Sequence, residues 1–222
     1  MEAASKRGRR KAVHRGVELV CSMRFEEEAR AAGHAVVAGV DEVGRGALCG
    51  PVVAAAVVLG SGFAPDGLDD SKRLTARQRI ALDVRIREQA RGFAIGIADH
   101  EEIDRVNILR ATLLAMKRAV LALPVKPDLL LIDALRVPGL EIEQLPIVKG
   151  DAQSASIAAA SIVAKVMRDA LMRDLDHAHP GYDLARNMGY GSEEHRLALR
   201  RLGPSKVHRR SFHGTTQGWL FS

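Results

Sequence analysis

Cysteine is scarce in this sequence, and the two cysteines present are not arranged to bind metal or to build a disulfide framework. Among 222 residues only Cys21 and Cys49 occur, in no CxxC or Cys/His ligand spacing. A disulfide-stabilised secreted domain and a structural zinc site are therefore not indicated. A reducing compartment fits this composition, and we expect a cytoplasmic protein.

Long apolar runs are also lacking. The longest, such as residues 51–59, fall well below the roughly 20 residues of a transmembrane helix. The apolar run 17–23 is interrupted by Glu18 and followed by further acids, which is too short and too polar for a secretory signal. Hydrophobic residues make up 47% of the chain, so a folded protein with one or two domains is expected and no membrane partner.

Charge is unevenly distributed along the chain, whose net charge is +6. Residues 1–15 contain six Lys or Arg and one acid, and residues 196–222 contain six Lys or Arg and no acid. The segment between them is therefore net acidic. Clustered basic ends indicate a polyanionic partner, most often nucleic acid, although a solvated tail and a charged helix face would have the same composition.

Hydrophobic patterning predicts an α/β protein. We expect a disordered basic arm at 1–15, an α/β part at 16–185 and a small helical part at 186–222. Buried strands are predicted at 35–40, 51–59, 92–99, 129–133 and 145–148. Helices are predicted at 17–32, 75–89, 101–123, 156–174 and 193–202. This order predicts a mixed sheet with helices on its faces.

Four carboxylates lie where predicted strands end or helices begin. Asp41 and Glu42 end the first strand, Asp133 ends the fourth, and Asp151 precedes the long helix. Since the carboxyl ends of parallel strands meet at one crevice, these side chains can converge. Asp41 and Glu42 can share a site only if the strand ends or bulges between them. Clustered carboxylates need a cation, and hard divalent ions such as Mg²⁺ or Mn²⁺ prefer oxygen ligands.

A glycine-rich loop, Gly44-Arg45-Gly46, follows the first two acids and allows main-chain amides to approach a ligand. The surrounding segment, residues 39–56 (GVDEVGRGALCGPVVAAA), resembles the opening signature of the bacterial ribonuclease HII family, the type 2 ribonucleases H. The resemblance continues through residues 70–74 (DSKRL), 149–151 (KGD), 189–191 (GYG) and 208–212 (HRRSF), and it covers about residues 35–213 in order.

The resemblance implies an RNase H-like mixed five-stranded sheet flanked by helices, which would form a catalytic domain at 16–185, with a small C-terminal helical part at 186–222 that would bind substrate. It also implies an endonuclease that cuts the RNA strand of RNA/DNA hybrids and cuts 5′ of single ribonucleotides in duplex DNA, leaving 3′-OH and 5′-phosphate ends. Two Mg²⁺ or Mn²⁺ ions would lie on Asp41, Glu42, Asp133 and Asp151. The loop that senses the ribose 2′-hydroxyl would be Gly44-Arg45-Gly46, and the tyrosine that packs on the sugar would be Tyr190.

Other residues have roles that are less closely defined. Lys72, Arg73 and Lys165 are candidate phosphate contacts, and a solvated role would account for them as well. The family usually has Lys where this chain has Met188, so one phosphate contact is expected to be missing or supplied by Arg186. Histidines 195 and 208 are expected to be structural, because metal-activated water needs no histidine base. We expect a monomer.

Two other functions remain compatible with the sequence. The first is a non-catalytic module that binds RNA/DNA hybrids, although a pure binder gains nothing from carboxylates facing phosphates. The second is another RNase H-like metal-dependent enzyme, such as a DNA nuclease. The glycine-rich loop and Tyr190 favour the ribonuclease.

Overall fold

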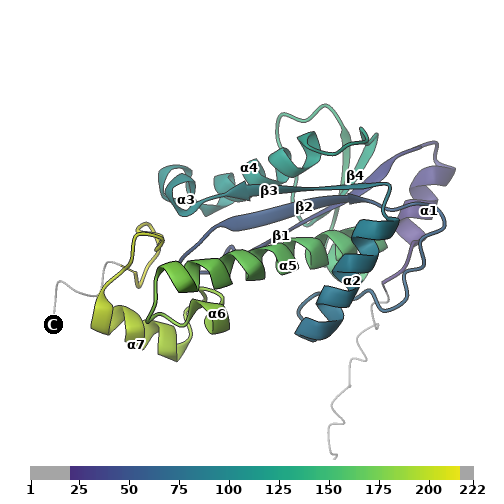
Figure 1. Ribbon diagram of the computed structural model, residues 1–222. Helices are drawn as coiled ribbons and strands as arrows, with labels where there is room; N and C mark the ends of the chain where they lie inside the picture. Colours follow the sequence, from purple (N-terminus) through teal and green to yellow (C-terminus); the bar gives the residue numbers. More distant parts are fainter. Residues whose placement is uncertain (1–20, 216–222) are drawn as a thin grey trace, which may run out of the picture.

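The computed structural model describes residues 21–215 and contains one mixed five-stranded sheet (Figure 1). Its strands lie in the order β3-β2-β1-β4-β5. The first three strands along the chain pair antiparallel, whereas β4 pairs parallel with β1 and β5 with β4. This confirms the predicted fold class. The strands are β1 (Val37–Val43), β2 (Val52–Val58), β3 (Gly92–Ala98), β4 (Leu129–Asp133) and β5 (Glu143–Ile147).

Helices cover both faces of the sheet. The main ones are α4 (Ile108–Leu121) on one face and α5 (Ala155–Ala178) on the other, each packed over its own hydrophobic core (Figure 1). The strand between these cores, β2, is buried along its whole length. The other helices are α1 (Arg24–Ala31), α2 (Ala76–Gln89), α3 (His100–Val106), α6 (Leu184–Asn187), α7 (Glu193–Leu202) and the short 3₁₀ helix η1 (Gly150–Ala152).

Small residues let α5 lie unusually close to β1. A Cβ atom added at Gly39 would lie 2.0 Å from the carbonyl carbon of Ser156, which no packing arrangement tolerates. Residues 158–160 of α5 are all alanine and fully buried. The close contact fixes the start of α5, and with it Asp151 just upstream, relative to the end of β1 where Asp41 lies.

Several element boundaries differ from the sequence prediction. The first helix of the described residues begins at Arg24, because Ser22 forms a β-bridge with Ser154 and is not helical. Residues 17–20 of the predicted helix lie outside the described residues. The helix predicted at 101–123 is two helices, α3 and α4, separated at Asn107. Asn107 has a left-handed φ of 71°, and its side chain accepts a hydrogen bond from the Arg110 N–H, which starts the second helix.

The C-terminal part packs on the end of α5 through a small core of its own, which includes Leu48, Met172, Tyr182 and Leu199. It is also joined to the glycine-rich segment by a β-bridge between Cys49 and His208. The division of the chain into a catalytic domain and a substrate-binding part stays a prediction, and the basic arm 1–15 lies outside the described residues. No helix within residues 21–215 combines the length and the apolar character needed to cross a membrane.

Candidate active site

The predicted carboxylates lie at the end of the sheet where the pairing between β1 and β4 stops. The last paired residues are Val40 and Ile132, and Asp41 and Asp133 follow directly on the two strands. One expectation was wrong: β1 neither ends nor bulges after Asp41, because it stays paired with β2 through Val43. Glu42 can still approach the others because β4 no longer covers this edge of β1.

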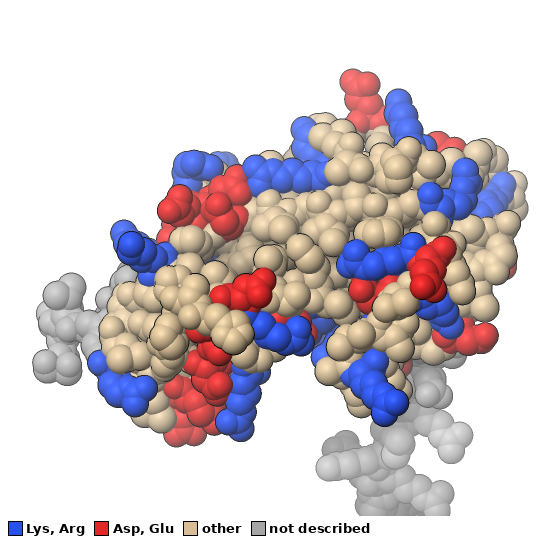
Figure 2. Space-filling model, in the orientation of Figure 1, with Lys and Arg blue, Asp and Glu red and all other residues tan. Residues whose placement is uncertain are grey.

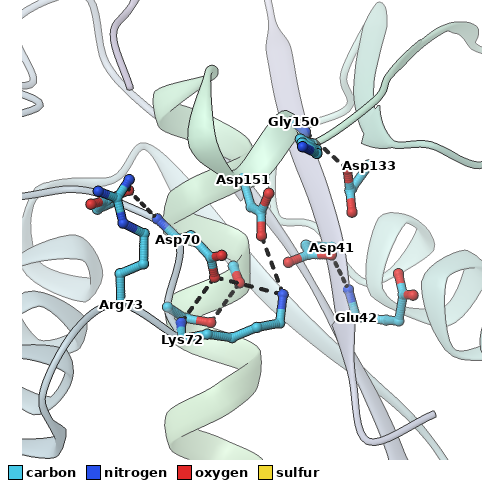
Figure 3. Close-up of polar contacts among 12 residues, drawn as sticks. Asp41, Glu42, Asp70, Lys72, Arg73, Asp133, Gly150 and Asp151 are labelled. Atoms are coloured by element: carbon cyan, nitrogen blue, oxygen red, sulfur yellow. Dashed lines mark hydrogen bonds and ion pairs between the residues drawn. The ribbon is translucent and has the colours of Figure 1, made fainter. Parts of the chain in front are cut away.

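Figure 3 shows the four carboxylates around this edge, with Asp41 and Glu42 on either side of β1. Asp133 lies opposite them and accepts a hydrogen bond of 2.9 Å from the Gly150 N–H. That bond links β4 to η1, which contains Asp151. The four acids come from three separate segments and lie around one end of the sheet, although within residues 21–215 no three of them have carboxylate oxygens that all lie within 4.8 Å of one another.

The four carboxylates repel one another electrostatically. Burial raises the pKa of Asp41 well above its ordinary value, and the neighbouring carboxylate of Glu42 raises it further. Burial also raises the pKa values of Glu42 and Asp151, to which Asp133 adds by its charge. Carboxylates in such an environment favour a proton or a metal ion.

The donor set fits a hard divalent cation. Glu42 Oε1 accepts a hydrogen bond of 3.1 Å from the Arg45 guanidinium. The other carboxylate oxygen, Oε2, is buried and has no hydrogen-bond partner among the described residues. A buried carboxylate oxygen without a partner is costly. Oxygen ligands from Asp and Glu, with no sulfur and no imidazole, are those that Mg²⁺ and Mn²⁺ prefer.

Lys72 extends from the loop before α2 toward the same carboxylates (Figure 3). Its ammonium lies 3.5 Å from Asp151 Oδ2 and 3.6 Å from Asp70 Oδ1. Partial burial lowers the pKa of Lys72, but the charges of Asp70 and Asp151 outweigh this effect and raise it overall. Lys72 is thus a permanent positive charge at the rim of the acidic group.

The other two predicted phosphate contacts are engaged elsewhere. Arg73 pairs with Asp69 at 3.2 Å and is largely exposed. Lys165 pairs with Asp169 at 2.7 Å on the same helix, and both side chains are mostly buried. Basic and acidic side chains are interspersed on the face shown in Figure 2 and form no single basic surface there.

The glycine-rich loop and Tyr190 are both at the surface. Gly44 is buried with a φ of 94°, whereas Arg45 and Gly46 are exposed. Tyr190 is 38% exposed, and the guanidinium of Arg168 lies 5.4 Å from the centre of its ring. One face of the tyrosine is therefore supported from below while part of the ring remains accessible.

Met188, which stands where the resemblance expects a lysine, has its own place in the fold. It adopts a left-handed φ of 51° and packs partly against the C-terminal core. Arg186, the suggested replacement, is 79% exposed at its side chain and lies 3.9 Å from Asp183. An exposed cation, paired with Asp183, therefore lies two residues before position 188, and whether it replaces the missing charge stays a prediction.

A second group of potential ligands lies in the C-terminal part. Within residues 21–215, three side chains have potential metal-ligand atoms that all lie within 4.8 Å of one another, namely Cys49, His195 and His208. Hydrogen bonds account for the histidines, whose ring nitrogens all have partners. The positive charges of Arg168 and Arg209 beside Cys49 also disfavour a cation.

Sequence reasoning missed Arg168 and Arg209, which are both fully buried next to the glycine-rich loop and Tyr190. Arg168 lies in the predicted long helix, where a charged residue would normally face water, and although Arg168-Asp169 is part of the resemblance to the family, no role was predicted for it. Arg209 lies in the HRRSF segment that carried the resemblance, so its motif was noted while its role was not.

Comparison with known proteins identifies the family of this chain. The family model described as Ribonuclease HII matches residues 38–215. A Ribonuclease HII of Desulfitobacterium hafniense is 56% identical over 190 residues, which is 86% of this chain and 73% of that protein. A Ribonuclease HII of Acaryochloris marina is 56% identical over 181 residues, covering 79% of this chain and 91% of that protein.

Solved structures show the same fold. The crystal structure of the ribonuclease H2 from Pyrococcus horikoshii superposes with a TM-score of 0.68 at 26% identity, covering 81% of this chain and 95% of that one. A Bst-RNase HIII in complex with Mn²⁺ matches in fold with a TM-score of 0.60 at 20% identity, over 84% of this chain and 70% of that one. The chain belongs to the ribonuclease HII family and is a metal-dependent ribonuclease H.

Proposed function

We propose that this enzyme hydrolyses the phosphodiester on the 5′ side of a ribonucleotide, both within the RNA strand of RNA/DNA hybrids and at single ribonucleotides in duplex DNA. The products would carry 3′-OH and 5′-phosphate ends. Asp41, Glu42, Asp133 and Asp151 would bind two Mg²⁺ or Mn²⁺ ions. We further propose that the protein acts in the cytoplasm as a monomer.

The observation that supports this proposal most strongly is the convergence of four carboxylates at the open edge of β1, next to the glycine-rich loop (Figure 3). Alone, such a group would repel a phosphodiester. Two divalent ions bound there would activate a water molecule and stabilise the leaving oxygen. The partnerless Glu42 Oε2 and the raised pKa values of three of the acids favour cation binding.

The residues around the acids would select and orient the substrate. The exposed Arg45 and Gly46 offer main-chain groups that could contact a 2′-hydroxyl, the one group that distinguishes RNA from DNA at a given nucleotide. Tyr190 offers an accessible ring face to the neighbouring sugar. Lys72 lies close enough to the acids to contact the scissile or an adjacent phosphate.

A cleavage assay tests the proposal directly. A labelled DNA duplex with one central ribonucleotide is incubated with the enzyme in Mg²⁺, in Mn²⁺ and in EDTA, and the cut is mapped. We expect one cut 5′ of the ribonucleotide that requires the metal. Asp41→Asn and Asp133→Asn should each lower the rate by at least about 100-fold, because even outer-shell changes at metal sites cost about 10–100-fold.

The controls separate the alternatives. Asp66→Asn, which changes an exposed aspartate on another loop, should cut at the wild-type rate. Binding of the duplex without cleavage would favour a non-catalytic module. Cleavage of the same duplex without a ribonucleotide at a comparable rate would favour a DNA nuclease.

A further inference from the structure

Two arginines that are completely buried lie behind the glycine-rich loop and Tyr190. Arg168 and Arg209 each have an exposed fraction of 0%. Neither forms an ion pair with a carboxylate in the part of the chain that the structure describes. Burial of a charge costs a great deal unless it is well hydrogen-bonded. Their partners are main-chain carbonyls.

Arg209 binds the carbonyls of the glycine-rich loop. Its guanidinium donates to the Gly44 oxygen at 2.8 Å and to the Arg45 oxygen at 2.9 Å. Two more of its N–H groups reach the Gly50 oxygen at 3.0 and 2.9 Å. The planar fork of arginine suits this pattern, whereas an ammonium is a single point charge.

These bonds determine which way the loop amides face. All peptide bonds of the described chain are trans, and in a trans peptide the C=O and the N–H point in opposite directions. Because the Gly44 and Arg45 carbonyls face inward to Arg209, the N–H groups of Arg45 and Gly46 face outward. Neither N–H has a hydrogen-bond partner within residues 21–215.

Arg168 holds the segment around Tyr190 in place, as Arg209 holds the glycine-rich loop. Its guanidinium lies under the tyrosine ring and donates to the Met188 oxygen at 2.9 Å, which holds the segment leading to the ring. It also reaches back to the Pro51 oxygen at 2.9 Å and the Cys49 oxygen at 3.4 Å.

The two arginines share one short segment. The consecutive carbonyls of residues 49–51 are divided between them, since Arg168 takes the outer two and Arg209 the middle one. The glycine-rich loop and Tyr190 are thus connected through these buried hydrogen bonds, and the Leu48 N–H also donates directly to the Gly189 oxygen at 2.7 Å, next to Tyr190. Burial, followed by the charge of Arg168, lowers the pKa of Arg209 to about 9.

We propose that Arg209 and Arg168 are positioning residues for ribonucleotide recognition: Arg209 turns the Arg45 and Gly46 amides toward the 2′-hydroxyl, and Arg168 sets Tyr190 at the matching distance. This inference rests on the proposed function, because it assigns the geometry of that same site to residues that do not touch substrate. Their shared carbonyls at 49–51 make the two recognition elements one unit.

The inference is tested by steady-state cleavage of the one-ribonucleotide duplex with the variants Arg209→Lys and Arg168→Lys. Both variants keep the positive charge but lack the planar set of N–H donors of the guanidinium. We expect kcat to fall at least about 10-fold in each, within the range for supporting residues at an active site. The inhibition constant of an all-DNA duplex of the same sequence, which has no 2′-hydroxyl, should change less than about two-fold, as should the affinity for Mn²⁺. A purely structural role would weaken all three together.

Arg85→Lys is the matched control. Arg85 also donates to a loop carbonyl, that of Asp66 at 2.7 Å, and lies over an aromatic ring, that of Phe63. It should cut at the wild-type rate. If both Arg209→Lys and Arg168→Lys keep wild-type kcat, or if DNA and Mn²⁺ binding weaken in parallel with kcat, the inference is overturned.

A measurement on the unaltered protein decides the matter if both variants lose cooperative unfolding. Outward-facing amides at Arg45 and Gly46 should exchange their hydrogens as fast as an unprotected loop, and protection comparable to β2 would overturn the inference. The wild-type assay also separates the two proposals. If wild-type enzyme makes no cut at the ribonucleotide, the proposed function fails, whereas a wild-type cut that both variants retain refutes the positioning role alone.

Discussion

The Nε2 atoms of His195 and His208 lie 3.0 Å apart inside the C-terminal part, where both rings are almost completely buried. The Ser205 N–H donates to His208 Nδ1 at 3.0 Å, so the proton of His208 is on Nε2. That proton is donated to His195 Nε2, and His195 Nδ1 in turn donates to the Tyr190 oxygen at 2.9 Å. The chain of bonds requires both imidazoles to be neutral.

This pair should make stability depend on pH. Burial, followed by the proximity of His195, lowers the pKa of His208 to about 4, and burial also lowers the pKa of His195. The unfolded chain binds protons near pH 6.5, before the folded protein does. The stabilisation is therefore complete above pH 6.5 and is lost as pH falls toward 4, by about 3 kcal/mol for His208.

Urea unfolding at pH 7.5, 6, 5 and 4.5 measures this dependence. His208→Gln should be less stable than wild type at pH 7.5, and the gap in unfolding free energy should narrow steadily toward pH 4.5. His177→Gln, at an exposed histidine of α5, should parallel wild type. A gap that is constant across this range would contradict the prediction.

Neutralising one buried acid should separate stability from activity. Asp41 is 5% exposed, and burial together with Glu42 disfavours its charge. Without metal, Asp41→Asn should therefore raise the melting temperature by several degrees, corresponding to about 1–2 kcal/mol. With Mn²⁺ present, wild type should gain stability in proportion to bound ion and the variant should gain much less.

Thermal unfolding in EDTA and in Mn²⁺ gives, for each protein, the stability without metal and the gain in stability on metal binding. Cleavage measured on the same samples should be lost in Asp41→Asn despite its greater stability. A variant that is less stable than wild type in EDTA would mean that Asp41 is held by hydrogen bonds more strongly than it is repelled.

Lys72 should compete with metal. Its ammonium is 3.5 Å from Asp151 Oδ2 but is largely exposed, so the interaction is near the solvent limit of about 1 kcal/mol at this distance. Lys72→Met should therefore bind Mn²⁺ about two- to five-fold more tightly in a calorimetric titration. Lys126→Met, an exposed lysine before β4, should bind as wild type does. Weaker Mn²⁺ binding by Lys72→Met would exclude competition.

The mixed sheet could be predicted from sequence because its strands are short apolar runs separated by turns or helical stretches. Strand order follows less directly, since β1 lies between β2 and β4, which are far apart in the chain. The break at Asn107 has a local cause, because Asn is a favoured N-cap residue and tolerates a left-handed φ. The residues on both sides continue a helical period, and that pattern outweighed the single Asn in the prediction.

The four acids could be located from sequence because strand ends converge, and the family resemblance pointed to the same residues. The two buried arginines behind the glycine-rich loop and Tyr190 could not be located in this way. Apart from the Met188 oxygen, which is 20 residues from Arg168, the carbonyls that Arg168 and Arg209 bind are 117 to 165 residues away in the chain, and no local pattern indicates such partners. Lys165 was singled out by its charge, yet a neighbour one turn away, Asp169, pairs with it.

The two glycines that flank Arg45 should respond differently to alanine. At Gly44, φ is 94° and an added Cβ would lie 2.1 Å from Arg168 Nε, so Gly44→Ala should lose about 1–3 kcal/mol of stability and displace the arginine. At Gly46 an added Cβ would meet nothing within 4 Å, and stability should change by less than about 0.5 kcal/mol.

Activity should nevertheless fall in both, for different reasons. In Gly46→Ala the new methyl group would stand on the exposed side of the loop, where the proposed sugar would approach, so the fold stays intact and kcat/KM on the one-ribonucleotide duplex drops at least about 10-fold. Chemical denaturation and cleavage kinetics on the two variants test this. Wild-type kinetics in a fully stable Gly46→Ala would mean that no substrate atom approaches the loop at Gly46, and recognition of the 2′-hydroxyl would then have to come from Arg45 or Tyr190.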